Sequence, residues 1–384
     1  MLAKTCYIVA MNDGHKVGTI IAVGGGKGGV GKSILSVALG TVLARSGVSV
    51  VLVDLDLGSA NLHTYLGIRG RTPGIADFIL GKVPSLENLV VETPVDNMGL
   101  ISGAEFVPGV TNPAHWMKLK LMRHLRALPA DYIILDLGAG VQFNTLDFFG
   151  ISDHGVVITA PEPGAVMNAY SFIKGALFRK MQNIFKHHDE ISALIDAETR
   201  NSDSEKRFTL DWFSNQLKQV APDLLPLIDE IEASFTPALI INRAPEGQTH
   251  VLVKNLLSLC TEKLGITLEH VGDIPDVREI SNHLLNVTRF FDLPVGRPYY
   301  TATKKIIDRI LRNVSLEAVR KARAFDFSDE ERDEILSLID TLDERVFSKT
   351  RKNAWKLRMF FKPADVVGYL ISRGITHPLF YKSA

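Results

Sequence analysis

The sequence of 384 residues predicts a doubly wound α/β fold, in which helices cover a mostly parallel sheet. From Thr19 to about Asn313, apolar β-rich runs alternate with segments of helical character. The runs are apolar at consecutive positions, which is typical of strands that are buried on both faces. The predicted strands are Thr19–Val23, Ser49–Val53, Gly99–Ile101, Tyr132–Leu137, Gly155–Ala160, Ala238–Ile241 and Glu269–Gly272.

Two segments do not fit the alternation of strands and helices, and they define the predicted domain organisation. Residues 1–313 form the predicted α/β domain, and residues 175–235 within it form a helical insertion. The insertion contains two predicted helical stretches, Asp211–Val220 and Asp223–Glu232. Residues 314–384 are predicted to be a helical C-terminal extension.

The composition limits the classes of protein to be considered. Lys+Arg and Asp+Glu are balanced at 43 each, so net charge gives no argument for general binding to nucleic acid or membranes. The two cysteines, Cys6 and Cys260, are far apart, which predicts a reducing compartment without a disulfide framework. No apolar stretch approaches the roughly 20 residues of a membrane span, and the N-terminal apolar run is too short for a signal peptide. We therefore expect a cytoplasmic protein, at most peripheral at the inner face of the cell membrane.

A glycine-rich stretch follows the first predicted strand. Gly26-x-x-x-x-Gly31-Lys32-Ser33 satisfies the phosphate-binding loop pattern and leads into a helical sequence, Ile34–Arg45. Glycines let consecutive backbone N–H groups turn toward phosphate oxygens, and a helix N-terminus adds positive potential. Lys32 is expected to reach the outer phosphates and the Ser33 hydroxyl to ligate Mg²⁺. The pattern predicts a nucleoside triphosphate site.

Carboxylates follow two other predicted strands. Asp54 and Asp56 end the second strand, and Asp136 ends the strand Tyr132–Leu137. Carboxylates at the end of a buried strand are costly unless they face a cation or water. Beside a phosphate loop, they are expected to support Mg²⁺ and to orient an attacking water. The alternative is a solvated strand end, in which Asp56 or Asp54 caps a helix.

These motifs together resemble the MinD/ParA family of deviant Walker A ATPases, which are P-loop NTPases of the SIMIBI type. The resemblance rests on Lys27 within the loop and on five further segments. These are Val53–Asn61 (VDxDxxxxN), 135–140 (LDLGAG), 159–174 (TAPEPGAVMNAYSFIK), 239–244 (LIINRA) and 272–277 (GDIPDV). The GAG and PEP…AY…IK runs are most similar to the FlhG subgroup, also called FleN or YlxH. The insertion and the C-terminal extension are not typical of that subgroup.

The resemblance implies ATP and Mg²⁺ as cofactors and assigns roles to residues of this chain. Lys32 and Lys27 would act on the phosphates, with Lys27 reaching the site of a partner subunit in an ATP-sandwiched homodimer. Asp56 would orient the hydrolytic water, and Ser33, Asp54 and Asp136 would hold the metal. The implied nucleotide-binding residues are Gly26, Lys27, Gly28, Gly29, Val30, Gly31, Lys32, Ser33 and Ile34, with Asn242, Arg243, Pro275, Asp276 and Val277 at the adenine.

The function implied is a switch ATPase that acts with a regulatory protein partner in the positioning or number control of a cellular structure. Regulation of the flagellum type is favoured. Two alternatives stay open: a partition-type ATPase that binds DNA nonspecifically, and a nucleotide-binding scaffold with little hydrolysis. An iron–sulfur carrier is disfavoured because neither cysteine belongs to a Cys-x-x-Cys motif.

A basic and aromatic segment lies in the extension. Residues 348–362 (SKTRKNAWKLRMFFK) have six Lys/Arg and no acidic residue, and Pro363 ends the run. Such a segment is expected either to bind a membrane surface or to pack on the ATPase domain with a solvated basic face. Contact with nucleic acid or a protein partner is a third possibility.

Overall fold

The computed structural model of the chain describes residues 18–56, 61–70, 72–103, 115–200, 209–245, 247 and 249–323. The chain divides into two compact units, one of residues 17–310 and one of residues 1–16 with 311–384. Of the second unit, only residues 311–323, at the end of one helix, are described. The rest of the predicted C-terminal extension, with residues 348–362, lies outside the described residues.

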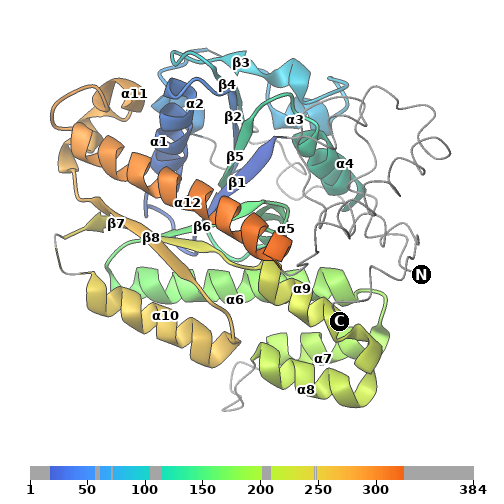
Figure 1. The fold of residues 1–384 in the computed structure, drawn as a ribbon. Coiled ribbons are helices and arrows are strands. Elements are labelled where there is room, and N and C mark those ends of the chain that lie inside the picture. The colour runs from blue at the N-terminus through green and yellow to red at the C-terminus, as the bar shows by residue number, and fades with distance from the viewer. Residues whose placement is uncertain are drawn as a thin grey trace, which may run out of the picture. The chain divides into compact units, whose positions relative to one another are not determined.

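The unit of residues 17–310 is built on the predicted α/β sheet. Its eight strands have the order β3-β4-β2-β5-β1-β6-β7-β8, and all neighbours are parallel except β3 and β4 (Figure 1). The strands are β1 Thr19–Gly24, β2 Val50–Leu55, β3 Val91–Glu92, β4 Met98–Ile101, β5 Tyr132–Leu137, β6 His154–Thr159, β7 Ala238–Ala244 and β8 Glu269–Pro275. The predicted mostly parallel sheet is therefore confirmed.

Helices flank the sheet, with α1 on one face and α6 and α10 on the other (Figure 1). The helices are α1 Lys32–Arg45, α2 Leu62–Tyr65, α3 Ile75–Ile79, α4 His115–Arg126, α5 Phe143–Gly150, α6 Pro163–Phe185, α7 Asp189–Arg200, α8 Leu210–Val220, α9 Pro226–Ser234, α10 His250–Leu264, α11 Val287–Phe290 and α12 Arg297–Arg323. No helix among the described residues has both the length and the apolar character needed to cross a membrane.

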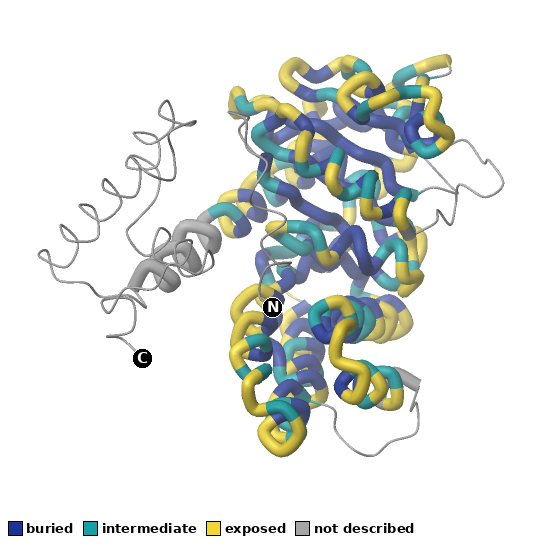
Figure 2. Tube along the Cα trace, turned by 90° about the vertical axis from the view of Figure 1, so that its right-hand side faces the viewer, coloured by how far each residue is buried: buried dark blue, intermediate teal, exposed yellow. Residues whose placement is uncertain are grey.

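Burial explains why the strands are apolar on both faces. All six residues of β2 are buried, as are five of the six residues of β1 and of β5 (Figure 2). At about 25 cal/mol per Å² of buried apolar surface, such central strands supply much of the driving force for folding. The sheet also fixes the location of the site, because the loops after parallel strands meet at its carboxyl edge.

Two predicted helix boundaries were wrong. The helix after the glycine loop begins at Lys32 rather than Ile34, because Gly31 adopts the left-handed conformation (φ 99°) and the helix starts directly after it. The predicted single helix Asp223–Glu232 is a 3₁₀ turn, Pro222–Leu224, followed by α9. The break falls at Pro226, which has no N–H and so begins a helix more readily than it continues one.

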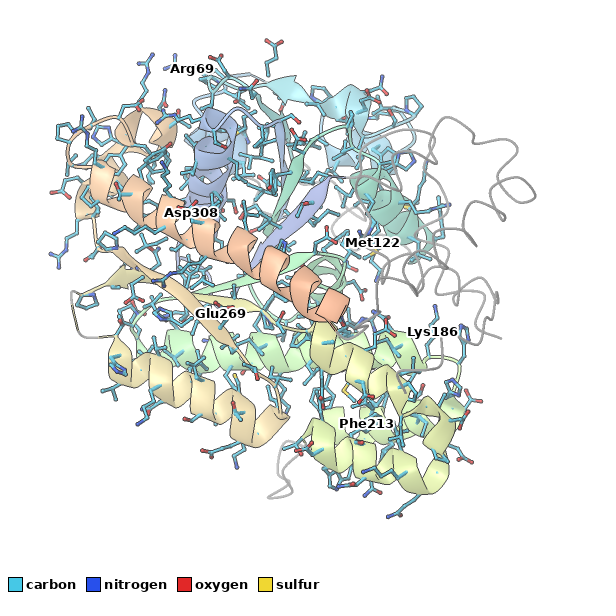
Figure 3. The ribbon with its side chains drawn as sticks, in the orientation of Figure 1. Arg69, Met122, Lys186, Phe213, Glu269 and Asp308 are labelled. Atoms are coloured by element: carbon cyan, nitrogen blue, oxygen red, sulfur yellow. The ribbon has the colours of Figure 1, made fainter. Side chains whose placement is uncertain are left out.

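Residues 175–235, the predicted insertion, contain the end of α6 and the helices α7, α8 and α9. Helices α7, α8 and α9 pack beside the C-terminal half of α6 (Figure 3). Phe213 of α8 is fully buried, and its ring lies 5.6 Å from that of Phe185 at the end of α6. These contacts attach the insertion to the α/β domain through α6.

Candidate functional site

The glycine loop lies between β1 and α1, at the carboxyl edge of the sheet. Gly29 (φ 75°) and Gly31 (φ 99°) adopt left-handed backbone conformations, which residues with a Cβ rarely adopt. No heavy atom lies within 4 Å of a Cβ built on Gly28 or Gly29. The backbone of the loop is therefore open to a ligand on this side. Val30 is buried, and Ile34 is half-buried in the first turn of α1.

Lys32 is buried within the site. Its side chain belongs to the first turn of α1, and Nζ donates to the carbonyl of Lys27 at 3.3 Å. Burial lowers the pKa of Lys32, while the nearby carboxylates of Asp136 and Asp56 act in the opposite direction. The three predicted residues Lys32, Asp56 and Asp136 are thus brought together.

Asp54 and Asp136 lie on adjacent strands at the same register position, and both are buried. Asp54 accepts hydrogen bonds from the backbone N–H groups of Asp56 (3.2 Å), Asn61 (2.9 Å) and Leu62 (3.1 Å). Burial and then the charge of Asp136 raise the pKa of Asp54 to about 7. Two buried carboxylates at adjacent positions repel each other, and a cation between them would relieve that repulsion.

Asp136 accepts hydrogen bonds from two hydroxyls of α1. Ser33 is one donor, and Ser36 Oγ is the other, at 2.9 Å from Oδ1. Burial raises the pKa of Asp136 to about 6, and the two serine hydrogen bonds oppose that rise. Ser36 was not among the predicted site residues. Its position three residues after Ser33, on the same side of a helix, was the available signal.

The loop after Asp136 lies against the phosphate loop. The N–H of Gly140 donates to the carbonyl of Gly25 at 3.3 Å, and Gly140 has a left-handed φ of 93°. A Cβ on Gly138 would lie 3.4 Å from Oδ1 of Asp56. Asp56, half-buried at the end of β2, therefore faces this loop as well as Lys32.

Lys27 forms an ion pair within its own chain. Its Nζ lies 3.0 Å from Oε2 of Glu162, and the other carboxylate oxygen accepts from Arg243 at 3.3 Å. The hydrogen bond and charge of Lys27, followed by the charge of Arg243, lower the pKa of Glu162. Glu162 was not predicted as a site residue. Its position between Pro161 and Pro163, where the backbone is restricted, was the only local signal.

Asn242, at the carboxyl end of β7, contacts the phosphate loop directly. Its Nδ2 donates to the carbonyl of Val30 at 2.8 Å, and a Cβ on Gly31 would lie 2.2 Å from that nitrogen. Among the described residues, Asn242 Oδ1 is buried and has no hydrogen-bond donor. Arg243 follows with a left-handed φ of 53°, which is uncommon for a residue with a side chain.

The second predicted adenine segment ends β8, the neighbour of β7. Pro275 pairs in register with Ala244, which brings Pro275–Val277 beside the end of β7. The Asp276 carboxylate accepts from Nε of Arg278 at 3.3 Å. The two predicted segments therefore meet at the edge of the sheet.

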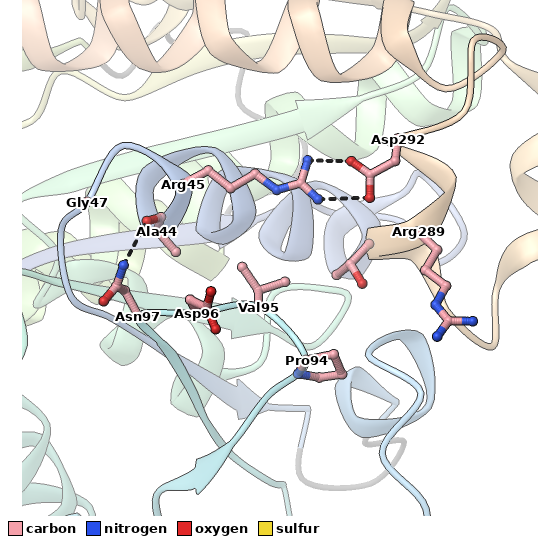
Figure 4. Close-up of a pocket in the computed structure, with 10 residues that line it drawn as sticks. Ala44, Arg45, Gly47, Pro94, Val95, Asp96, Asn97, Arg289 and Asp292 are labelled. Carbon is pink, nitrogen blue, oxygen red and sulfur yellow. Dashed lines mark hydrogen bonds and ion pairs between the residues drawn. The ribbon is translucent and has the colours of Figure 1, made fainter.

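A different hollow, of about 530 Å³, lies at the other end of α1 (Figure 4). Arg45, the last residue of α1, lines it and forms a bidentate ion pair with Asp292 at 2.9 and 3.1 Å. The predicted nucleotide-site residues are not among those that line this hollow.

Known proteins share both the sequence pattern and the fold. Residues 21–373 match the family described as the CobQ/CobB/MinD/ParA nucleotide binding domain. The septum site-determining protein MinD of Bacillus subtilis is 28% identical over 244 residues, which are 62% of this chain and 88% of that protein. The flagellum site-determining protein YlxH of Helicobacter pylori is 32% identical over 165 residues, 40% of this chain and 52% of that relative.

A solved structure agrees at the level of the fold. The septum site-determining protein MinD of Pyrococcus horikoshii, complexed with Mg-ADP, superposes with a TM-score of 0.51 at 17% identity. The superposition covers 78% of this chain and 98% of that one. The family match spans most of the chain and includes the glycine loop and all three carboxylates. The chain therefore belongs to the CobQ/CobB/MinD/ParA family of nucleotide-binding proteins.

Proposed function

We propose that this chain is a MinD/ParA-type switch ATPase, which binds Mg-ATP, hydrolyses it and dimerises with ATP bound. The observation that supports the proposal most strongly is the buried carboxylate pair, Asp54 and Asp136, next to Lys32 and the hydroxyl of Ser33. Beside the open glycine loop, the buried Lys32 cation complements the negative charge of a triphosphate. The two buried carboxylates complement the positive charge of a bound metal ion.

The donor set fits a magnesium ion. Mg²⁺ prefers oxygen ligands and is commonly held by one or two carboxylates together with substrate phosphates. Ser33, Asp54 and Asp136 would hold the ion directly or through water. When bound, the ion would neutralise negative charge on the phosphates. The raised pKa values of the two carboxylates also fit, because a divalent cation stabilises their ionised forms.

The free acceptor at Asn242 fits an adenine base. One N–H of Nδ2 donates to Val30, and the buried Oδ1 is an acceptor without a donor among the described residues. The exocyclic amino group of adenine is a donor and could satisfy it, whereas the corresponding oxygen of guanine is an acceptor. Arg243 and Pro275–Val277 would border the base.

Hydrolysis would depend on Lys32 and Asp56. The Lys32 ammonium would stabilise negative charge that develops on the phosphates, an effect strengthened by burial. Asp56 faces the loop after Asp136 and would orient the attacking water by accepting a hydrogen bond from it.

Dimerisation would use Lys27. This lysine is exposed, and its pair with Glu162 involves side chains that are about half exposed (45% and 50%). Solvent screens exposed ion pairs and they contribute little to stability, so this pair can break at small cost. We propose that Lys27 leaves Glu162 to reach the triphosphate of a second subunit.

For the biological role, we propose positioning or number control of a cellular structure, with regulation of the flagellum type favoured. The relative named as a flagellum site-determining protein supports this choice. We also propose a regulatory protein partner that stimulates hydrolysis. We further propose a cytoplasmic protein that contacts the membrane peripherally through residues 348–362. Within the insertion, α9 has acidic residues and no basic one, so this helix does not favour nonspecific DNA binding.

The decisive test measures phosphate release and molar mass in the same preparation. With Mg-ATP, we expect slow phosphate release and a shift from monomer to dimer in light scattering. With Mg-ADP the protein should remain a monomer. An absence of ATP binding would contradict the proposal, whereas binding without hydrolysis would favour the scaffold alternative.

Two further assays separate the proposed contacts. Sedimentation with vesicles of anionic phospholipid, with the full chain and with a chain lacking 348–384, tests the membrane contact. ATP-dependent retention of DNA that disappears with salt would instead favour the partition-type alternative.

A further inference from the structure

A continuous run of polar side chains joins the helical insertion to the helix that follows the site loop. It begins at Asp147 on α5, passes through Arg179 and Gln182 on α6, and ends at Asp196 on α7. α5 begins directly after the loop of residues 138–142, and α7 belongs to the insertion. The run therefore connects a segment that the family resemblance does not explain with a loop of the nucleotide site.

Asp147 is the centre of this run. Its side chain is only 4% exposed, yet it accepts hydrogen bonds from three residues on two other helices. Arg179 donates from Nε (2.6 Å) and from a terminal nitrogen (3.0 Å), Asn183 donates at 3.2 Å, and Lys118 of α4 donates to Oδ2. Burial raises the pKa of Asp147, but the hydrogen bonds from Arg179 and Lys118 outweigh burial and lower it overall.

Arg179 contacts α5 at a second point. Its guanidinium lies 4.9 Å from the centre of the Phe143 ring, in the first turn of α5. α5 is thus held at Phe143 and at Asp147, one helical turn apart. The loop that precedes Phe143 contacts the phosphate loop through Gly140 and Gly25. A shift of α5 would therefore change the hydrogen bond between Gly140 and Gly25.

The other end of the run depends on the insertion. Gln182 accepts from Arg179 at 3.3 Å and donates to Asp196 Oδ1 at 2.8 Å. Lys118 and Arg179 share the single carboxylate of Asp147, which leaves one positive charge without a counterion within that group. Asp196 of α7, in the insertion, is the acidic residue at the end of this run, and it is joined to Arg179 by the two hydrogen bonds of Gln182.

Attachment of the insertion does not require this polar run. Ile191 and Ile195 of α7 are buried, and the Phe185–Phe213 ring contact joins α6 to α8. A buried ionic cluster is seldom more stabilising than apolar packing of the same volume, so stability alone is a weak reason for it. A role in fixing one particular arrangement is better supported.

We propose that Asp147 is a positioning residue that links the helical insertion to the loop of residues 138–142, so that an effect on α7 alters ATP turnover. This inference rests on the proposed ATPase function. The insertion is then the regulatory element of the site. Helix α6, whose C-terminal end belongs to the insertion, is the rigid connection to α5.

The test uses the full chain with two variants that interrupt the run outside the site. Gln182→Leu removes the amide but keeps a helix-forming side chain, and Asp196→Asn removes only the charge. Asp196→Glu should retain activity near that of the wild type. Glu230→Gln is the matched control, because it removes an exposed acidic charge from α9 of the same insertion.

We expect Gln182→Leu and Asp196→Asn to change kcat on the order of three- to thirty-fold, with KM for ATP within about two-fold. Amide hydrogen exchange in residues 138–150 should become faster in both variants, and Glu230→Gln should match the wild type. Unchanged kcat and exchange in the two variants would overturn the inference. A lower Tm with unchanged exchange in 138–150 would show a purely structural role and overturn it equally.

Failure of the proposed function is distinguishable from failure of this inference. If the wild-type chain binds ATP without hydrolysing it, turnover cannot test the link. Amide hydrogen exchange in residues 138–150 with Mg-ADP and with a non-hydrolysable ATP analogue then tests it instead. A nucleotide-dependent difference that spreads to α7 in the wild type, and is lost in Gln182→Leu, supports the link. If amide hydrogen exchange in α7 is the same with both nucleotides, the proposed link is refuted.

Discussion

Asp54 and Asp136 are register partners on the parallel strands β2 and β5, and both side chains are buried. Burial and mutual repulsion raise the pKa of Asp54 to about 7, and burial raises that of Asp136 to about 6. The pair is therefore suited to hold a proton without metal and to release it when a cation binds.

The first prediction concerns pH and stability. In the unfolded chain both carboxyls return to their ordinary pKa near 3.8. Because the folded values are higher, the folded state binds more protons between about pH 4 and pH 7. The stabilisation is therefore complete below pH 4 and is lost as the pH rises through 6 and 7. Without metal, we expect the free energy of unfolding to fall by on the order of a few kcal/mol across this window.

Denaturant unfolding between pH 5 and pH 8 checks this prediction. Asp54→Asn should flatten the dependence, whereas Asp96→Asn, an exposed control, should not. Mg-ATP should also flatten it, because the bound ion favours the ionised pair. An unchanged slope in Asp54→Asn would contradict the assignment of the buried proton to this pair.

The second prediction concerns Lys32. Lys32→Ala should abolish ATP binding or turnover, because it removes the buried cation beside the phosphate loop. The expected loss in kcat/KM is at least about 100-fold, as for other stabilising groups of phosphoryl transfer. Lys254→Ala, an exposed lysine on α10, is the control and should bind ATP as the wild type does. For both variants, steady-state phosphate release measures kcat/KM, and equilibrium binding of a fluorescent ATP analogue measures binding.

The third prediction concerns Asp56. Asp56→Ala should bind ATP but stop hydrolysis, because the carboxylate is expected to orient water rather than to hold the nucleotide. The variant should accumulate as an ATP-bound dimer in light scattering. Normal phosphate release by Asp56→Ala would mean that another group orients the water.

The fourth prediction concerns Lys27. Lys27→Ala should leave ATP binding by the monomer within about three-fold, since the exposed ion pair with Glu162 contributes little to stability. Dimer formation and dimer-linked hydrolysis should be lost. Glu162→Gln removes the same ion pair without removing the lysine and so separates the two effects. If Lys27→Ala dimerised and hydrolysed ATP normally, the contact across subunits would be refuted.

The fifth prediction concerns Gly26, where the phosphate loop touches α6. A Cβ at this position would lie 1.9 Å from the backbone carbonyl oxygen of Asn168. Since a backbone oxygen cannot rotate away, Gly26→Ala should destabilise the fold by about 3 kcal/mol. Gly28→Ala meets nothing within 4 Å and should unfold as the wild type does in the absence of nucleotide. Equal thermal stability of the two variants would rule out this close approach.

Much of the site could be predicted because its signals are local. The glycine loop and the carboxylates each occupy a short stretch at the end of an apolar run, and strand ends in a parallel sheet converge. Asn242, at the end of β7, was predicted only through the family resemblance. The helix boundaries at Lys32 and Pro226 were missed because single-residue conformations, left-handed at Gly31 and proline-fixed at Pro226, decide them.

Contacts between segments far apart in the chain could not be predicted. Glu162 is 135 residues from Lys27, and nothing near either residue identifies the pair. Asp147 lies 29 residues from Lys118 and 32 from Arg179, and no sequence pattern near it identifies these partners. Side chains of this kind meet only when helices pack on the sheet in a defined order.

The sequence by itself determined the fold class, the phosphate loop and the residues at the strand ends, because apolar periodicity and glycine backbone freedom act over a few neighbouring residues. The tertiary structure alone decided that Asp54 and Asp136 share a register position, that Glu162 pairs with Lys27, and that the insertion is linked to α5. Strand order and helix packing bring those groups together, and burial then sets the energy of their charges.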